Sequence, residues 1–154
     1  MIDRRRTSIA ALALSASTFV ALLLQEGYSD RTYTPVPGDV PTIGFGTTSG
    51  VKEGDKITPP VAVARALTDT QKFEGVLKEC IKVPLSQNEY DAYVSFTYNI
   101  GPTAFCKSNL VKKLNSGDYE GACNELTKWV YVKGRYSRGL DNRRQAEKKL
   151  CLGY

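Results

Sequence analysis

The chain has 154 residues, enough for one domain with a buried core. Its net charge of +5 indicates an anionic partner, and nucleic acid, anionic lipid and acidic cell-wall polymers all qualify. Histidine is absent, which excludes Ser-His-Asp and Cys-His catalysis and most zinc sites. Acid–base chemistry near neutral pH must then use carboxylates, Lys, Tyr or Cys, and we expect no cofactor.

The N-terminus has the order of an export signal. The basic head Asp3-Arg4-Arg5-Arg6 precedes an uncharged run from Thr7 to Leu24, so the arginines should stay cytoplasmic. The run is just long enough to span a bilayer as a helix, but its serines, threonines and five alanines make it weakly hydrophobic. We therefore predict a retained signal-anchor helix over residues 1–25, followed by a catalytic domain over 26–154.

The same run could also survive outside the membrane, packed by one face against a soluble domain. At helical spacing one stripe contains Ile9, Leu12, Ala16, Phe19, Val20 and Leu23, with Leu14 and Leu22 as exceptions. Two alternatives stay open, a permanent anchor and a cleaved signal peptide. Cleavage is possible because Ala11-Leu12-Ala13 and Ser15-Ala16-Ser17 are small-x-small sites.

The remaining elements predict class α+β, a small β-containing lobe followed by a helical lobe with a substrate cleft between them. Glu26 to Ser49 lacks a helical period and indicates short strands and turns. Thr58-Pro59 starts a helix that should run to about Cys80. Ser86-Gln-Asn-Glu89 is a capping box whose helix should end near Gly101. Further helices are expected over Thr103 to Leu114, Tyr119 to Trp129 and Asp141 to Leu150.

Four cysteines suggest two disulfides in an exported chain: Cys80, Cys106, Cys123 and Cys151. None belongs to a Cys-x-x-Cys pair, which argues against a metal cluster. From the order of the elements we expect Cys80 to pair with Cys106 and Cys123 with Cys151, each bond tying neighbouring helices. Residues 1–26 contain no cysteine, so a thiol-exchange switch in that segment is excluded.

The stretch that carries chemistry is Glu26-Gly-Tyr-Ser-Asp-Arg-Thr-Tyr33, followed by Gly38-Asp39-Val-Pro-Thr42-Ile-Gly-Phe-Gly-Thr47. It places one carboxylate at a helix end, a second on a strand–turn unit and a threonine hydroxyl three residues later. Glycosidic cleavage needs a protonated acid beside the leaving oxygen and a second group on the other face. A helix-end glutamate among apolar neighbours suits the acid, because burial raises its pKa. Spacing alone is weak evidence, since loop carboxylates are usually solvated.

This stretch resembles the catalytic motif of phage lysozymes of glycoside hydrolase family 24. In that family a glutamate is followed by a Tyr-containing turn, an Asp or Cys nine residues on, and Thr-Ile-Gly-Tyr-Gly. Later segments of the chain also resemble the family, in the same order: 84–101, 104–106, 110–115, 129–134 and 139–147. The resemblance implies a lysozyme-like fold and an endolysin muramidase that hydrolyses the β-1,4 linkage of peptidoglycan for host cell lysis. It also implies Glu26 as the catalytic acid and Thr42 as the hydroxyl that helps to hold the water or the second carboxylate.

The second carboxylate is where the chain departs from the family. Nine residues after Glu26 stands Pro35, which has no acid–base chemistry. We assign the role to Asp39, with Asp30 as a fallback. The alternative is that Asp39 is only a turn residue and that Glu26 works with Thr42 and water alone.

Other residues are secondary candidates. Trp129, Tyr33 and Tyr98 could stack on sugar rings, although a single tryptophan in a helical lobe is more often part of the core. Arg143 and Arg144 could meet wall carboxylates, or lie on a solvated helix face.

The position of Glu26 suggests control by tethering, as signal-anchor-release endolysins also imply. Glu26 lies two residues beyond Leu24, so a membrane-spanning run would hold it at the headgroup boundary, away from Thr42. We expect export to the periplasm of a Gram-negative host, with tethering to the inner membrane before release. The expected partners are peptidoglycan and that membrane, not nucleic acid, and the expected state is a monomer.

Two rival functions remain. A lytic transglycosylase needs only one acidic residue. The presence of Pro35 where the family has an acid favours this function. A catalytically inactive, membrane-anchored wall-binding module would need none.

Overall fold

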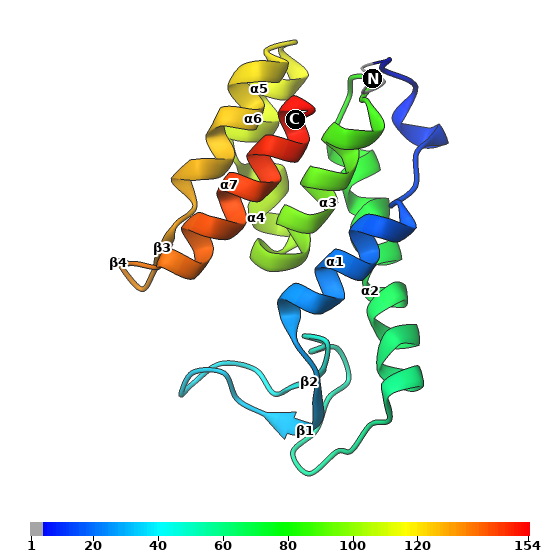
Figure 1. The fold of residues 1–154 in the computed structure, drawn as a ribbon, viewed down its shortest axis with the longest axis vertical. Helices are drawn as coiled ribbons and strands as arrows, with labels where there is room; N and C mark the ends of the chain where they lie inside the picture. Colours follow the sequence, from blue (N-terminus) through cyan, green and yellow to red (C-terminus); the bar gives the residue numbers. More distant parts are fainter. Residues whose placement is uncertain (1–4) are drawn as a thin grey trace. The chain divides into compact units, whose positions relative to one another are not determined.

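The computed structural model describes residues 5–154, so Asp3 and Arg4 of the basic head lie outside the described residues. The chain divides into two compact units, shown in Figure 1. Unit 1 comprises residues 5–15 and Phe73–Tyr154, and unit 2 comprises Ala16–Lys72. The division predicted after residue 25 concerned export and does not coincide with this boundary.

Unit 2 consists of a helix, a short hairpin and the start of a long helix. Helix α1 (Ala16–Glu26) leads into strand β1 (Ser29–Tyr33), which pairs antiparallel with β2 (Thr42–Gly44). Helix α2 (Pro59–Cys80) follows and continues into unit 1. Its bounds confirm the prediction made from Thr58-Pro59. The Thr58 carbonyl accepts the first helical bond, from the Ala62 N–H at 2.9 Å.

The Thr-Ile-Gly motif is the most buried part of this hairpin, since all three residues of β2 are buried. Gly44 has a φ of +63°, and a Cβ there would lie 3.0 Å from the Ala62 Cβ. Glycine is therefore required at position 44 for two reasons, the positive φ of its backbone and the close approach of α2. The Thr47 hydroxyl donates to the Asp69 carboxylate at 2.8 Å and fastens the following turn to the same helix.

Unit 1 is built around α3 (Gln87–Ile100), in which every residue from 89 to 97 is buried. The predicted capping box is present: the Ser86 hydroxyl accepts from the Glu89 N–H, and the Glu89 carboxylate accepts from the Ser86 N–H. The other elements are α4 (Pro102–Lys107), α5 (Asn109–Asn115), α6 (Tyr119–Glu125), a 3₁₀ turn η2 (Leu126–Lys128), β3 (Tyr131–Val132), β4 (Arg135–Tyr136) and α7 (Arg138–Leu152). The described part of the chain is thus α+β, with little sheet.

Three predicted helices have different bounds. The helix expected over 103–114 is two helices, because Ser108 leaves the helical conformation and caps α5 through the Val111 N–H. The helix expected over 119–129 ends at Glu125 and continues as η2. Helix α7 starts three residues earlier than expected, because Ser137 caps it through the Leu140 N–H. The β3–β4 hairpin was not predicted.

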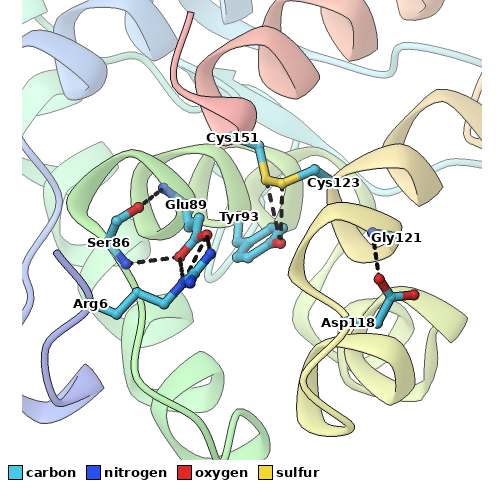
Figure 2. The surroundings of a disulfide bond; sticks show 8 residues. All are labelled: Arg6, Ser86, Glu89, Tyr93, Asp118, Gly121, Cys123 and Cys151. Atoms are coloured by element: carbon cyan, nitrogen blue, oxygen red, sulfur yellow. Dashed lines mark hydrogen bonds and ion pairs between the residues drawn. A yellow bond between two sulfur atoms is a disulfide. The ribbon is translucent and has the colours of Figure 1, made fainter. Parts of the chain in front are cut away.

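Both disulfides lie in unit 1. They join Cys80 to Cys106 and Cys123 to Cys151, the pairing predicted from the order of the elements, each with a Cα–Cα distance of 5.7 Å. Figure 2 shows the second disulfide beside Tyr93, whose hydroxyl lies 3.8 Å from one sulfur and 3.4 Å from the other. Burial raises the pKa of this phenol, so it stays protonated at physiological pH.

The N-terminal segment is not the continuous helix expected over Thr7 to Leu24. A 3₁₀ turn (Ile9–Ala11) is followed by non-helical residues until α1 begins at Ala16. The N–H groups of Leu14 and Ser15 donate instead to the carboxylates of Glu74 (2.7 Å) and Asp91 (3.0 Å). Among residues 5–154, no helix has the length and apolar character needed to cross a membrane.

The predicted packing face is right for the first part of this segment and only partly right for α1, where Phe19 and Leu23 are half-buried but Ala16 and Val20 are exposed. Ile9 and Leu12 pack against the unit 1 core, as does Leu14, an expected exception. In α1 the buried residue is Leu22, the other exception, whereas Val20 is 54% exposed. The break before Ala16 changes the rotation between the two parts, so one helical stripe cannot describe both.

Candidate active site

Glu26 is the last residue of α1, where the motif predicted a helix end. The helix stops because Gly27 adopts a φ of +72° and its N–H closes the last turn on the Leu23 carbonyl at 3.1 Å. Two residues later β1 begins, and the Glu26 side chain is half-buried. The backbone that carries the Glu26 carboxylate is therefore set by the junction of a helix and a strand.

Thr42 is the first residue of β2 and pairs with Tyr33, the last residue of β1. It is only 5% exposed, and its hydroxyl donates to the Val40 carbonyl at 3.2 Å. Because the hydroxyl proton is used in this bond, the oxygen can act as an acceptor toward a water molecule. The pairing of β1 with β2 thus connects the strand after Glu26 to the strand that starts at Thr42.

Asp39 lies in the exposed loop between these strands. Its N–H donates to the Val36 carbonyl at 2.9 Å, and Gly38 before it has a φ of +89°, which marks a tight turn. Pro35 is exposed in the same loop. The fallback, Asp30, is an exposed residue of β1 whose carboxylate lies 3.9 Å from the Arg31 guanidinium. The role of Asp39 as second carboxylate remains a prediction.

Two aromatic residues of the motif hold this hairpin together. The rings of Tyr28 and Phe45 have centroids 5.4 Å apart, and the Tyr28 hydroxyl donates to the Ile57 carbonyl at 2.9 Å. Tyr28 follows Glu26 by two residues and Phe45 follows β2, so the contact links the chain on both sides of the candidate site. Sequence reasoning assigned no function to either ring, although both stand beside the motif glycines.

The secondary candidates are mostly structural within unit 1. Arg143 and Arg144 are 7% and 0% exposed, so the expectation of a solvated face is wrong for both. Both arginines contact the Glu147 carboxylate, and Arg144 also donates to the carbonyl of Trp129 at 3.1 Å. Trp129 packs edge-on against Phe96, which confirms the alternative of a core tryptophan.

A polar cavity of about 260 Å³ lies elsewhere, in unit 1. It is lined by Arg6, Ser86, Asn88, Glu89, Tyr119, Glu120, the Cys123–Cys151 disulfide and residues 152–154. None of the predicted catalytic residues faces it. This cavity is therefore separate from the predicted catalytic residues.

The chain matches the family model described as phage lysozyme over residues 24–147. This match covers the whole motif and most of unit 1. The chain belongs to the phage lysozyme family. It is a glycoside hydrolase, an endolysin that cleaves peptidoglycan for lysis.

Individual relatives agree with this family. The chain is 43% identical to the SAR-endolysin of Pseudomonas phage phiKMV over 147 residues, 93% of this chain and 89% of that protein. Among solved structures it is similar to an endolysin from Escherichia coli O157:H7 phage FAHEc1 (TM-score 0.80, 38% identity, 96% of each chain). It is also similar to the muramidase domain of SpmX from Asticaccaulis excentricus (TM-score 0.82, 28% identity, 91% of this chain and 97% of that one).

Proposed function

We propose that this phage lysozyme hydrolyses the β-1,4 linkage between N-acetylmuramic acid and N-acetylglucosamine, with Glu26 as the acid. The observation that carries the proposal is the placement of Glu26 at the end of α1, directly before the strand that pairs with the Thr42 strand. A muramidase among the solved relatives supports the choice of linkage.

In this mechanism the Glu26 carboxyl group donates its proton to the glycosidic oxygen as the bond to the sugar carbon breaks. The Thr42 oxygen accepts a hydrogen bond from the attacking water and positions it. Asp39 supplies the second carboxylate and takes the proton of that water, or it stabilises the positive charge that develops on the sugar while the deprotonated Glu26 takes the proton of the water. Water adds to the sugar carbon, and the displaced sugar leaves with the proton from Glu26.

Replacing Asp39 by Asn tests the second carboxylate. We expect kcat/KM for the digestion of purified sacculi to fall on the order of 10²-fold, because the amide cannot take a proton or balance a developing charge. Asp30→Asn tests the fallback in the same assay and should change the rate less than twofold, and Glu53→Gln, an equal charge change at an exposed residue of the same unit, is the matched control. Full activity of the Asp39 variant would mean that this residue only shapes the turn.

We further propose that residues 1–25 tether the protein to the inner membrane after export, and that residues 5–15 dock on unit 1 after release into the periplasm. The name SAR-endolysin of the phiKMV relative supports the proposal. The docking contacts support it as well. In the tethered state residues 5–15 would lie in the cytoplasm or the membrane, whereas in the structure they bind the rest of unit 1.

Arg6 makes the strongest of these contacts. Its Nη2 and Nε atoms lie 2.8 and 3.1 Å from the two oxygens of the buried Glu89 carboxylate (Figure 2). Its guanidinium stacks 3.5 Å from the centre of the Tyr119 ring. The hydrogen bond to Glu89 raises the pKa of Arg6, so this guanidinium keeps its positive charge at physiological pH.

Ser15 makes a second polar contact at the other end of the docked segment. Its hydroxyl donates to Asp91 at 2.6 Å and its N–H to the same carboxylate at 3.0 Å. Such contacts cannot form while the arginine head is cytoplasmic and unit 1 is periplasmic. Docking therefore stabilises the released state over the tethered one.

Replacing Ser15, Ser17 and Thr18 by leucine tests the tether. We expect slower release and slower lysis, because three more apolar side chains hold the run in the bilayer. Replacing the same residues by asparagine also removes the Ser15 hydroxyl but lowers the apolarity of the run, and should speed release. The measurements are the membrane-bound fraction after export and the time to lysis. Equal lysis times for the two variants would show that the tether does not control activity.

A further inference from the structure

The β3–β4 hairpin of unit 1 carries an exposed surface that the proposed chemistry does not use. Tyr131 pairs with Tyr136 and Val132 with Arg135, leaving a turn of two residues, Lys133 and Gly134. The hairpin projects beyond the start of α7 in Figure 1, and all six of its residues are exposed. The Ser137 N–H donates to the Val130 carbonyl at 2.8 Å and closes the base of the hairpin.

Two large aromatic rings meet on this hairpin. Tyr131 and Tyr136 are 63% and 56% exposed, with ring centroids 6.3 Å apart and an interplanar angle of 73°. The Tyr136 hydroxyl donates to the Asp141 carboxylate at 2.6 Å, which fixes that ring. A single exposed aromatic residue needs no explanation. Two rings held together on a short projection form an apolar surface that stays exposed in the folded protein.

Three cationic residues lie in the hairpin or just after it in sequence. Lys133, Arg135 and Arg138 are exposed, and none of them makes an ion pair with any residue between 5 and 154. Elsewhere in unit 1, Lys113 and Lys128 both pair with Glu125. The hairpin charges are therefore available to an anionic ligand.

Lys133 does not serve the turn itself. Lys133 and Gly134 have φ values of +49° and +78°, as a type I′ turn requires, and Lys133 is the one non-glycine residue with positive φ in the described part of the chain. Asparagine or glycine fits this position with less strain than lysine. Its side chain is thus a candidate for a role outside the fold.

We propose that this hairpin is a second binding surface for the cell wall, one that takes a carboxylate-bearing glycan strand. The C–H face of a sugar ring packs on a tyrosine ring, whose face is electron-rich. The lactyl and peptide carboxylates of the strand bind Lys133, Arg135 and Arg138. The inference rests on the peptidoglycan substrate of the proposed function but not on the role of Glu26.

Charge and shape favour the wall over an anionic membrane. A membrane-binding loop inserts apolar side chains below the headgroups. Here the tip is Lys133-Gly134, and the aliphatic side chain of the hairpin, Val132, stands before the turn. The tyrosines lie at the base of the hairpin, where they can contact a strand laid across it.

Retention on purified sacculi tests the proposal. The full chain carries Glu26→Gln so that binding is measured without digestion. Tyr131→Ala with Tyr136→Ala, and separately Lys133→Gln with Arg135→Gln and Arg138→Gln, should each weaken retention about tenfold. The triple variant should also lose most of the salt dependence of binding. Converting the carboxylates of the sacculi to neutral amides should weaken the retention of the parent protein and leave the retention of the triple variant unchanged.

Matched controls separate a surface from a general charge effect. Lys107→Gln with Lys112→Gln and Lys149→Gln removes three exposed cations elsewhere in unit 1, and Tyr154→Ala removes another exposed ring. Both controls should retain parental binding. The proposal is overturned if the control triple weakens retention as much as the hairpin triple, or if neither hairpin variant changes retention.

Vesicles containing phosphatidylglycerol provide the third arm. If the hairpin variants lose vesicle binding while keeping sacculus binding, the surface binds lipid and the proposal is wrong. Digestion of the sacculi by the Glu26→Gln protein would show that the assignment of Glu26 as the acid is wrong. That result is distinct from unchanged retention, which concerns the hairpin alone.

Lys133→Asn supplies a test with opposite signs. Asparagine relieves the backbone strain of the turn, so the Tm should rise by roughly 2 °C. Retention on sacculi should nevertheless fall severalfold, because a cation is lost. A lysine kept only by chance would show the rise in Tm with no loss of binding, and that outcome contradicts the proposal.

Discussion

Glu26→Gln is expected to lower kcat/KM for sacculus digestion about 10³-fold, which corresponds to roughly 4 kcal/mol of transition-state stabilisation. Glutamine has the same shape and cannot donate a proton. Because Gly27 ends α1 through the backbone alone, the helix and the β1–β2 hairpin should keep their structure. The rate is measured by the turbidity of a sacculus suspension, and the fold by circular dichroism.

Glu53→Gln is the matched control for this variant. Glu53 is an exposed residue of the same unit, so the charge change is the same and the site is untouched. It should digest sacculi at the parental rate. A Glu26→Gln protein that matched its rate would remove Glu26 from the mechanism.

Glu147→Ala is expected to have the largest effect on stability, lowering the free energy of unfolding by about 3–5 kcal/mol. The Glu147 carboxylate is 4% exposed, contacts Arg143 at 3.1 Å and Arg144 as well, and accepts the Ser95 hydroxyl at 2.9 Å. Its removal leaves two buried guanidinium groups without this carboxylate. Their contacts with the Ser95 and Trp129 carbonyls remain and limit the loss.

Urea unfolding measures this effect as a lower transition midpoint at an unchanged slope. Glu79→Ala is the control, an exposed glutamate near the end of α2, and should change stability by less than about 0.5 kcal/mol. A loss below about 1 kcal/mol for Glu147→Ala would mean that the buried charges find other partners. The role given to this network would then be wrong.

The elements that the sequence predicted well are those fixed by local chemistry. Thr58-Pro59 begins α2 and Ser86 with Glu89 begins α3, because a cap and its first turn lie within a few residues. The division between α4 and α5 is also local, but helical periodicity continues across Ser108 and conceals it. The β3–β4 turn was missed because Lys-Gly is a weaker hairpin signal than Asn-Gly.

The N-terminal segment depends on contacts far along the chain. Leu14 and Ser15 leave the helix to bind Glu74 and Asp91, which lie 60 and 76 residues away. No pattern within residues 7–24 contains that information. The disulfide pairing, in contrast, was predicted correctly from the order of the elements alone.

The candidate site was predicted in its outline and not in its supports. The motif placed Glu26 at a helix end, and Thr42 was found at the start of a buried strand. The need for glycine at position 44 emerged only with the Ala62 side chain opposite it. The burial of Arg143 and Arg144 had a usable signal, because Glu147 follows them at helical spacings of four and three residues.

The chemical form of the released sugar ends tests the central claim most directly. Sacculi are digested in oxygen-18 water and the soluble fragments are analysed by mass spectrometry. Hydrolysis through Glu26 predicts reducing N-acetylmuramic acid ends that each carry one heavy oxygen from the solvent. Anhydro ends without heavy oxygen would contradict it. Such ends form when a hydroxyl of the same sugar attacks the anomeric carbon and displaces the leaving sugar, as in a transglycosylase.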